Sequence, residues 1–242
     1  MTGTEQLYLR DSYDRAFVGR VVDVQEHNVV LDRSLFYPRG GGQMADRGML
    51  EAYGRTYLVV SVEKRGGTVY HAVDGPLPSV GEEVRGTIDW EHRYRQMRTH
   101  TALHVLCGVI YHRFSSLVTG CQMYPDRARM DFTLSDLSRE RVDEIERLSN
   151  EAIRAGYPVR VRFVPRREAN LMPELIRTKV SLVPPEINPI RVVEIVGLDL
   201  QADGGTHVAN TIEVGSIRIT KTENKGRENR RLEIELQPAV PE

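Results

Sequence analysis

Short β-type runs separated by turn residues fill the first ninety residues, and they constrain the fold more than any other feature. Within each run apolar and β-branched residues recur, and pairs such as Tyr53-Gly54 and Gly66-Gly67 supply turn chemistry between runs. The runs cover residues 17–24, 28–32, 49–63, 68–73 and 84–89. Many short strands with frequent turns are typical of small barrels. The sequence therefore predicts a small β-barrel domain over residues 1–89.

The pattern changes at Asp89. Residues 90–117 contain no proline and place apolar residues such as Met97, Leu103 and Leu106 at helical spacing, which predicts a long helix. A second helix is predicted over 138–155, where Gly156 marks the stop. Strand-like runs and one short helix follow. This mixture predicts an α+β fold for residues 90–242, with a mainly antiparallel sheet packed against helices.

Charge and composition narrow the classes of partner and site. The 33 Lys and Arg nearly balance the 34 Asp and Glu, so no overall charge attracts nucleic acid. Only four of the basic residues are Lys, and arginine clusters at residues 93–98, 160–167 and 227–231 suit either phosphate contact or solvated faces. Two cysteines do not suggest a disulfide framework. The lack of a long apolar stretch and of a signal-like N-terminus predicts a cytoplasmic protein with no membrane partner.

Two histidines four residues apart on the long predicted helix form the strongest chemical signal. His100 and His104 project from one helix face, a spacing that can chelate one ion, although packed or hydrogen-bonded histidines would show the same spacing. The pair lacks the adjacent glutamate of zinc proteases, so a peptidase is disfavoured. Farther along, the Gly204-Gly205 turn lets Asp203 and His207 converge on one point. Three histidines and a carboxylate would complete a metal site.

Cys107 is an alternative ligand, since it lies on the same face of the predicted helix as the histidine pair. Its neighbours Leu106 and Val109 are apolar, which favours a small buried residue over a ligand. Cys121 has no assigned role.

Three ordered blocks of the chain resemble the AlaX family, free-standing relatives of the alanyl-tRNA synthetase editing domain. Residues 34–43 and 46–48 are similar to its FYPxGGGQ block. Residues 100–104, with 128–132 downstream, resemble its HxxxH and R-x-D-F segments. Residues 204–215 resemble its CGGTHV block. The threonyl-tRNA synthetase editing domain shares the metal pattern, but the glycine-rich block favours the alanyl branch. Length and the N-terminal barrel are similar to medium-length members.

The resemblance implies a fold and a site. It implies one zinc ion per chain bound by His100, His104 and His207; Asp203 stands where the family has Cys, so Asp203, water or Cys107 completes the set. Oxygen in place of sulfur makes a harder site. It also implies Gln43 and Ser34 as catalytic residues, Ser34 standing where the family has Thr. The implied substrate-binding residues are Gly40, Gly41, Gly42, Arg129, Asp131, Gly205 and Thr206.

The residue types at these positions fit the implied roles, but most of them also fit a purely structural role. The three glycines expose backbone amides that could line a cleft, and Gln43 offers a donor and an acceptor, although the segment could be only a turn. Arg129 and Asp131 are expected on a strand, where they either bind substrate or form an internal ion pair with each other. Tyr94 and Tyr124 are possible stacking groups for RNA.

The function implied is hydrolysis of mischarged tRNA(Ala), mainly seryl-tRNA(Ala) and secondarily glycyl-tRNA(Ala). A hydroxyl-satisfying pocket would reject alanine because its polar group would be left unpaired. The expected partner is tRNA(Ala), through its acceptor stem and CCA end, and not DNA. Two alternatives remain: a non-catalytic metal- and tRNA-binding module, or a hydrolase acting on another aminoacyl-tRNA or small ester.

Overall fold

The computed structural model describes residues 3–178, 183–226 and 229–237. The chain divides into two compact units, Met1–Arg95 and Gln96–Glu242. The division falls a few residues after the predicted boundary because helix α1, Trp90–Phe114, begins in the first unit and continues into the second. The functional assignment of the two predicted domains stays a prediction.

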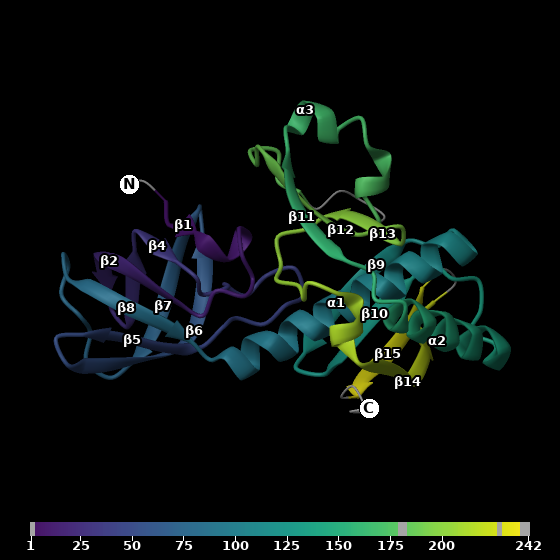
Figure 1. Ribbon diagram of the computed structural model, residues 1–242, viewed down its shortest axis with the longest axis horizontal. Coiled ribbons are helices and arrows are strands. Elements are labelled where there is room, and N and C mark those ends of the chain that lie inside the picture. The colour runs from purple at the N-terminus through teal and green to yellow at the C-terminus, as the bar shows by residue number, and fades with distance from the viewer. Residues whose placement is uncertain (1–2, 179–182, 227–228, 238–242) are drawn as a thin grey trace. The chain divides into compact units, whose positions relative to one another are not determined.

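A closed six-stranded antiparallel barrel forms the first unit (Figure 1), which confirms the predicted small barrel. Its strands follow each other around the barrel in the order β2-β3-β7-β6-β5-β8. A separate two-stranded parallel sheet and one 3-10 turn also belong to this unit. The bounds are β1 Glu5–Gln6, η1 Leu7–Leu9, β2 Ala16–Gln25, β3 Asn28–Leu31, β4 Arg33–Ser34, β5 Gly48–Ala52, β6 Arg55–Arg65, β7 Thr68–Asp74 and β8 Glu83–Ile88.

Alternation along the strands makes the barrel core. On β2 every second residue is buried from Phe17 to Val21, and the neighbouring strands add residues such as Val29, Leu50 and Val84 to the same cluster. Gly48 lies where β5 meets β8, and a Cβ there would lie 2.2 Å from the Thr87 carbonyl oxygen, so only glycine fits.

A buried ion pair holds the start of α1 to the barrel. The Arg93 guanidinium pairs with the Asp46 carboxylate and also donates to the carbonyl oxygens of Leu35 and Ser12. Neither charged side chain is more than 1% exposed. Because several hydrogen bonds satisfy the guanidinium, the buried charge is tolerated.

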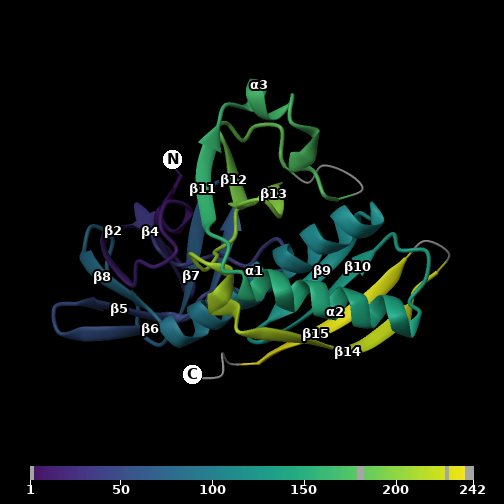
Figure 2. The same ribbon diagram turned by 45° about the vertical axis from the view of Figure 1, so that its right-hand side comes forward.

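The second unit contains a four-stranded antiparallel sheet in the order β14-β15-β10-β9, alongside which α1 and α2 run (Figures 1 and 2). Its buried face presents apolar residues such as Met130, Phe132 and Ile234. The bounds are β9 Val118–Tyr124, β10 Arg127–Phe132, α2 Arg139–Arg154, β14 Ser216–Asn224 and β15 Arg230–Gln237. The antiparallel sheet with helices confirms the predicted α+β class.

A second, three-stranded antiparallel sheet in the order β11-β12-β13 carries the short helix α3. Its bounds are β11 Val159–Val164, α3 Arg166–Ala169, η2 Pro173–Leu175, β12 Ile190–Ile195, β13 Asp199–Ala202 and, after it, η3 Thr211–Val214. β12 is buried along almost its whole length, whereas β11 is largely exposed. The central strand β12 is thus flanked by the half-buried strand β13 and the exposed strand β11.

The local signals for α2 are confirmed in detail. The Ser138 hydroxyl accepts from the Arg141 N–H as an N-cap, and Gly156 follows the helix with φ +68°. Helix α1 ends at Phe114, earlier than predicted, where Ser115 adopts φ +51°. Among the described residues no helix is both long and apolar enough to cross a membrane.

Candidate functional site

Four side chains that are far apart in the sequence meet in the second unit. His100 and His104 come from α1, while Asp203 and His207 come from the loop after β13. One ligand atom from each lies within 4.8 Å of all the others. The structure therefore brings together the four residues that the sequence predicted as metal ligands.

Each histidine has a second partner that orients its ring. His104 Nδ1 bonds the Asp199 carboxylate at 3.0 Å, and His207 Nδ1 lies 3.3 Å from the Thr101 hydroxyl. His100 has a hydrogen bond with the backbone of Thr206. Metal-binding histidines in general use their second ring nitrogen in this way, which leaves the first nitrogen for the ion.

Asp199 is itself held from two further sides. Arg177 Nε donates to Asp199 Oδ1 at 3.3 Å, and Gln201 Nε2 donates to Asp199 Oδ2 at 2.7 Å. The Arg177 guanidinium also stacks over the Tyr111 ring, at 3.8 Å from the ring centroid. The carboxylate behind His104 is therefore buried and fixed from several sides.

Asp203 is positioned by its own turn. Its Oδ1 accepts from the Gly205 N–H at 2.8 Å and from His207 Nε2 at 2.9 Å. Arg191 donates to the Asp203 carbonyl oxygen at 2.8 Å. The Asp203 side chain is 21% exposed, against 7% or less for the three histidines, so the cluster is reached from the Asp203 side.

The ionisation states of His100, His207 and Asp203 suit metal binding, whereas the pKa shift of His104 opposes it. Burial lowers the pKa of His100 to about 4 and that of His207 well below its ordinary value. Burial opposes ionisation of Asp203, but the charge of His100 and the hydrogen bond from His207 outweigh it and hold its pKa well below the ordinary value. Burial also disfavours charged His104, yet Asp199 raises its pKa. Neutral imidazoles and a carboxylate are the states in which these groups bind metals, so an ion at His104 would have to displace the proton that Asp199 favours.

The arrangement fits a small divalent cation. In a tetrahedral zinc site, ligand atoms about 2.1 Å from the ion lie about 3.4 Å from each other, and the ligand atoms of this cluster lie within 4.8 Å of one another. The paired contacts, such as 2.9 Å between His207 and Asp203, already lie near that value. Three nitrogens and one oxygen form a donor set used by zinc and other first-row metals.

The two cysteines lie outside this four-membered group. Cys107 is buried, and burial raises the pKa of its thiol well above the ordinary value. Because Cys107 is not among the side chains whose ligand atoms converge, the packing role predicted for it is favoured over the alternative of a fourth ligand. Burial raises the pKa of Cys121 as well.

Ser34 lies inside the barrel, hydrogen-bonded to a histidine that the sequence analysis did not single out. Its Oγ is 2.7 Å from His71 Nε2 and accepts from the Phe36 N–H at 3.1 Å. His71 Nδ1 faces the Val29 carbonyl oxygen at 2.9 Å, so Nδ1 carries the proton and Nε2 accepts from Ser34. Both side chains are fully buried. The predicted catalytic role of Ser34 stays a prediction.

The glycine-rich block forms a tight turn. Gly40 and Gln43 exchange backbone hydrogen bonds of 3.2 and 2.9 Å, and Gly41 and Gly42 adopt φ of +57° and +85°. Gly40 and Gly41 are exposed, whereas Gln43 is buried. A positive φ favours glycine, so the turn by itself accounts for glycine at these positions. The predicted substrate-binding role of the block stays a prediction.

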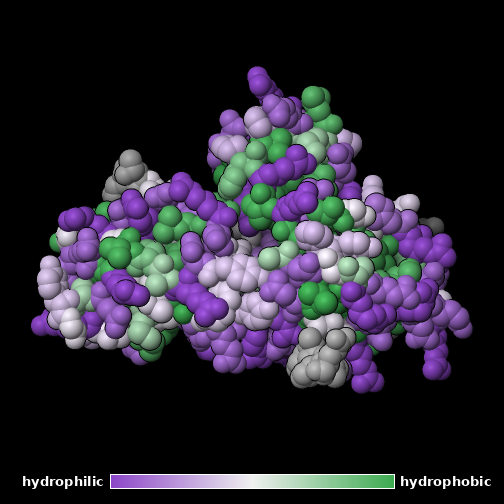
Figure 3. Space-filling view, in the orientation of Figure 1, coloured by the Kyte–Doolittle hydropathy of each residue, from purple (hydrophilic) through white to green (hydrophobic). Residues whose placement is uncertain are grey.

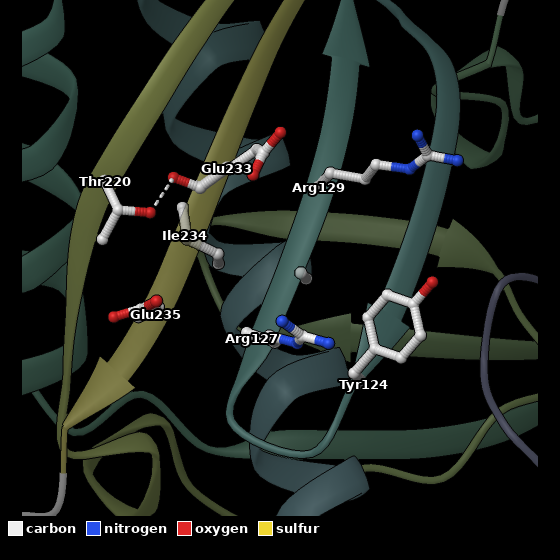
Figure 4. A pocket seen from close by; sticks show the side chains of 8 residues that line it. Tyr124, Arg127, Arg129, Thr220, Glu233, Ile234 and Glu235 are labelled. Atoms are coloured by element: carbon white, nitrogen blue, oxygen red, sulfur yellow. Dashed lines mark hydrogen bonds between the residues drawn. The ribbon is translucent and has the colours of Figure 1, made fainter.

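Arg129 and Asp131 lie on β10, on the face of the sheet opposite its buried residues. Asp131 makes a two-pronged ion pair with Arg231 of β15, at 2.7 and 2.8 Å, so the alternative of a pair between Arg129 and Asp131 is wrong. Arg129 instead lines a shallow hollow of about 350 Å³ (Figure 4). Tyr124 and Arg127 line the same hollow and stack on each other.

Gly205 and Thr206 lie next to the predicted ligands Asp203 and His207, and both are buried. Their roles in substrate binding stay predictions, while their backbones support Asp203 and His100 as described above.

Sequence reasoning missed the supporting residues Asp199, Arg177 and Arg191. A buried carboxylate preceding a predicted ligand by four residues, as Asp199 precedes Asp203, is a weak signal that only the strand register makes clear. Arg191 sits opposite Phe163 in the sheet, a relation that also needs the register.

Comparison with known proteins agrees with this architecture. Residues 6–92 match the family model of class II (A) tRNA synthetases, and residues 190–233 match that of the threonyl and alanyl tRNA synthetase second additional domain. The chain is 41% identical to the alanyl-tRNA editing protein AlaX-M of Saccharolobus solfataricus, over 97% of this chain and 100% of that one. AlaX-M of Methanosarcina barkeri is 40% identical over 96% and 99% of the two chains.

A similar sequence also forms part of a much longer protein. The alanine–tRNA ligase of Pyrobaculum neutrophilum is 41% identical over 91% of this chain but only 25% of its own length. With matches of this extent, the resemblance seen in the three sequence blocks is confirmed: the chain belongs to the AlaX-M family of alanyl-tRNA editing proteins.

Proposed function

We propose that this chain is a metal-dependent hydrolase that removes wrongly attached amino acids from tRNA(Ala), chiefly serine and secondarily glycine. The four-membered cluster of His100, His104, Asp203 and His207 carries the proposal, because all of its rings are oriented by further hydrogen bonds. The names of the AlaX-M relatives supply the substrate class.

One zinc ion per chain is the proposed cofactor. Bound by the four cluster residues, it would polarise the ester or orient the substrate. The ion-pair network behind His104 keeps that ring in place, and Arg191 and Gly205 keep Asp203 in place. In the proposal, Gly205 and Thr206 contact the substrate beside these ligands.

The first unit contributes the remaining proposed site residues. Gln43 and Ser34 are the proposed catalytic residues, and Gly40, Gly41 and Gly42 belong to the proposed substrate-binding set. Ser34 donates its only proton to His71, so a seryl hydroxyl could bond it only as a donor to the Ser34 oxygen. Since Ser34 is fully buried, that contact would require the barrel to open around it.

The partner in the proposal is the acceptor stem and CCA end of tRNA(Ala). Arg129 and Asp131 belong to the proposed substrate-binding set, although Asp131 is already committed to Arg231. A non-catalytic metal- and tRNA-binding module is the second candidate, favoured if the metal is held without turnover. A hydrolase for another aminoacyl-tRNA is the third.

The test is deacylation of seryl-, glycyl- and alanyl-tRNA(Ala) by the purified chain, with metal content measured on the same sample. We expect about one zinc per chain, rapid loss of serine, slower loss of glycine and little loss of alanine. Ser34→Ala should reduce the difference in deacylation rate between seryl- and alanyl-tRNA(Ala) if the Ser34 hydroxyl bonds the hydroxyl of the attached serine.

Two results would overturn the proposal. Equal rates on alanyl- and seryl-tRNA(Ala) would refute the specificity, and a metal-loaded protein without turnover on any of the three would favour the binding module. A Ser34→Ala variant that loses stability but keeps its selectivity would assign Ser34 to the barrel alone.

A further inference from the structure

A row of three neighbouring residues crosses the three-stranded sheet and ends at the cluster. Phe163 of β11 pairs with Arg191 of β12, and the backbone N–H of Asp203 donates to the Arg191 carbonyl oxygen at 3.1 Å. Directly opposed residues on adjacent strands point to the same face of a sheet. Phe163, Arg191 and the ligand Asp203 therefore share one face, spaced by about 4.8 Å per strand.

The next row repeats the arrangement with apolar residues. Val161 pairs with Val193, which pairs with Gln201, and Gln201 donates to the buried Asp199. Along β13 and β12 this face is buried or nearly so, but on β11 it opens: Val161 is 38% and Phe163 45% exposed. The backbone of an exposed aromatic residue thus lies about two strand spacings, roughly 10 Å, from that of a predicted metal ligand, at the open edge of a shared surface.

The other face of β11 has the opposite character. Arg160 and Arg162 alternate with Val161 and Phe163 and are exposed. Hydrophobic surface gathers around β11, β12 and α3, interspersed with hydrophilic residues (Figure 3). β11 is the edge strand of its sheet, so long arginine side chains on one face and a ring on the other are both available to a ligand that follows this edge.

An aromatic platform beside basic side chains is the combination that binds single-stranded nucleic acid. Bases stack on the ring while cationic groups meet the phosphates. The spacing of about two strands between Phe163 and Asp203 is comparable with the extent of a nucleoside. A ligand whose base rests on Phe163 can therefore present its ribose ester toward the cluster.

We propose that Phe163, extended by Val161, is the stacking platform for the terminal adenine of the aminoacyl-tRNA, with Arg160 and Arg162 contacting the phosphates that precede it. The inference rests on the proposed function, and it assigns a binding role to β11 that is independent of the metal. Phe163 positions the nucleoside and takes no part in the chemistry.

Two measurements test the platform. The first is the KM and kcat of Phe163→Ala on seryl-tRNA(Ala), compared with Phe163→Tyr. Loss of a stacked base should raise KM about ten-fold or more and change kcat little, and the tyrosine variant should restore the wild-type KM. Leu171→Ala removes another exposed apolar side chain, 81% exposed, and should behave as wild type.

The second measurement reads stacking directly and needs no turnover. Phe163→Trp places an indole at the platform. Its fluorescence is titrated with a non-aminoacylated RNA hairpin of the acceptor stem that ends in CCA, after subtraction of the wild-type signal from Trp90. We expect quenching by the intact hairpin and little by a hairpin whose last nucleotide lacks its base.

Either of two outcomes overturns the proposal: an unchanged KM in a folded Phe163→Ala variant, or equal quenching by the intact and abasic hairpins. Failure of the proposed function looks different, since the wild type would then leave every aminoacyl-tRNA intact while the fluorescence comparison still reports on stacking.

Discussion

Buried histidines occur in both units, and the two settings differ in where their second nitrogen points. In the barrel, His71 has both ring nitrogens satisfied by the fold, one by the Val29 carbonyl and one by Ser34. In the second unit, Asp199 holds Nδ1 of His104, and the ring lies among His100, Asp203 and His207. Both nitrogens of His71 meet groups of the barrel, whereas the histidines of the second unit converge on one another and on a carboxylate, an arrangement that can bind an ion.

The largest effect expected from this contrast is on metal content. His104→Ala should lose the metal and with it all measurable hydrolysis, because three remaining ligands no longer enclose the ion. His71→Gln, which removes the other kind of histidine, should keep its metal. Metal analysis and deacylation assays on the two purified variants make the comparison, and a metal-loaded His104→Ala protein would break it.

His71, the buried histidine of the barrel, should make the free energy of unfolding depend on pH. Burial lowers the pKa of His71 from its ordinary 6.5 to about 4, so the unfolded chain takes up a proton that the folded barrel refuses. Stability is therefore full above pH 6.5 and falls as the pH drops toward 4, by up to roughly 3 kcal/mol.

Urea unfolding followed by Trp90, which packs against the barrel core, measures this loss between pH 7 and 4. His71→Gln can still accept from Ser34 and donate to Val29 but cannot titrate there. Its stability should depend less steeply on pH over that interval, and an unchanged slope would show that other groups are responsible.

A smaller effect is expected for Asp199, the carboxylate that orients His104 in the second unit. Asp199→Ala should weaken metal binding about 10- to 100-fold, because His104 loses the partner that orients it. Asp199→Asn keeps an acceptor and should weaken binding less. Chelator competition measures the affinities, with Asp131→Asn as the matched control, since that carboxylate pairs with Arg231. Equal affinities for Asp199→Ala and the control would contradict the orienting role.

Local patterns sufficed for much of the fold. Alternation on strands such as β2 and the N-cap at Ser138 operate within a few residues, and the spacing of His100 and His104 follows from helix geometry alone. The approach of Asp203 and His207 was also predictable, because the Gly204-Gly205 turn lies between them. These features depend on short-range chemistry.

Long-range pairings were not predictable. Strands β9 and β13 were not separately identified, although the Pro125-Asp126 turn between two apolar runs is a hairpin signal. The partners of Asp131 and Ser34 lie 100 and 37 residues away. The choice of Arg231 over Arg129 is made by strand register, which no local pattern contains.

The carboxylate of Asp203 has a consequence for the chemical durability of the centre. Thiolates are oxidised stepwise by peroxide, and a metal site built on one loses its ligand at the first step. The four ligand groups here are imidazoles and a carboxylate, with both thiols outside the group. A metal site with these ligands would bind soft ions less tightly and would resist oxidants better than a site with a thiolate ligand.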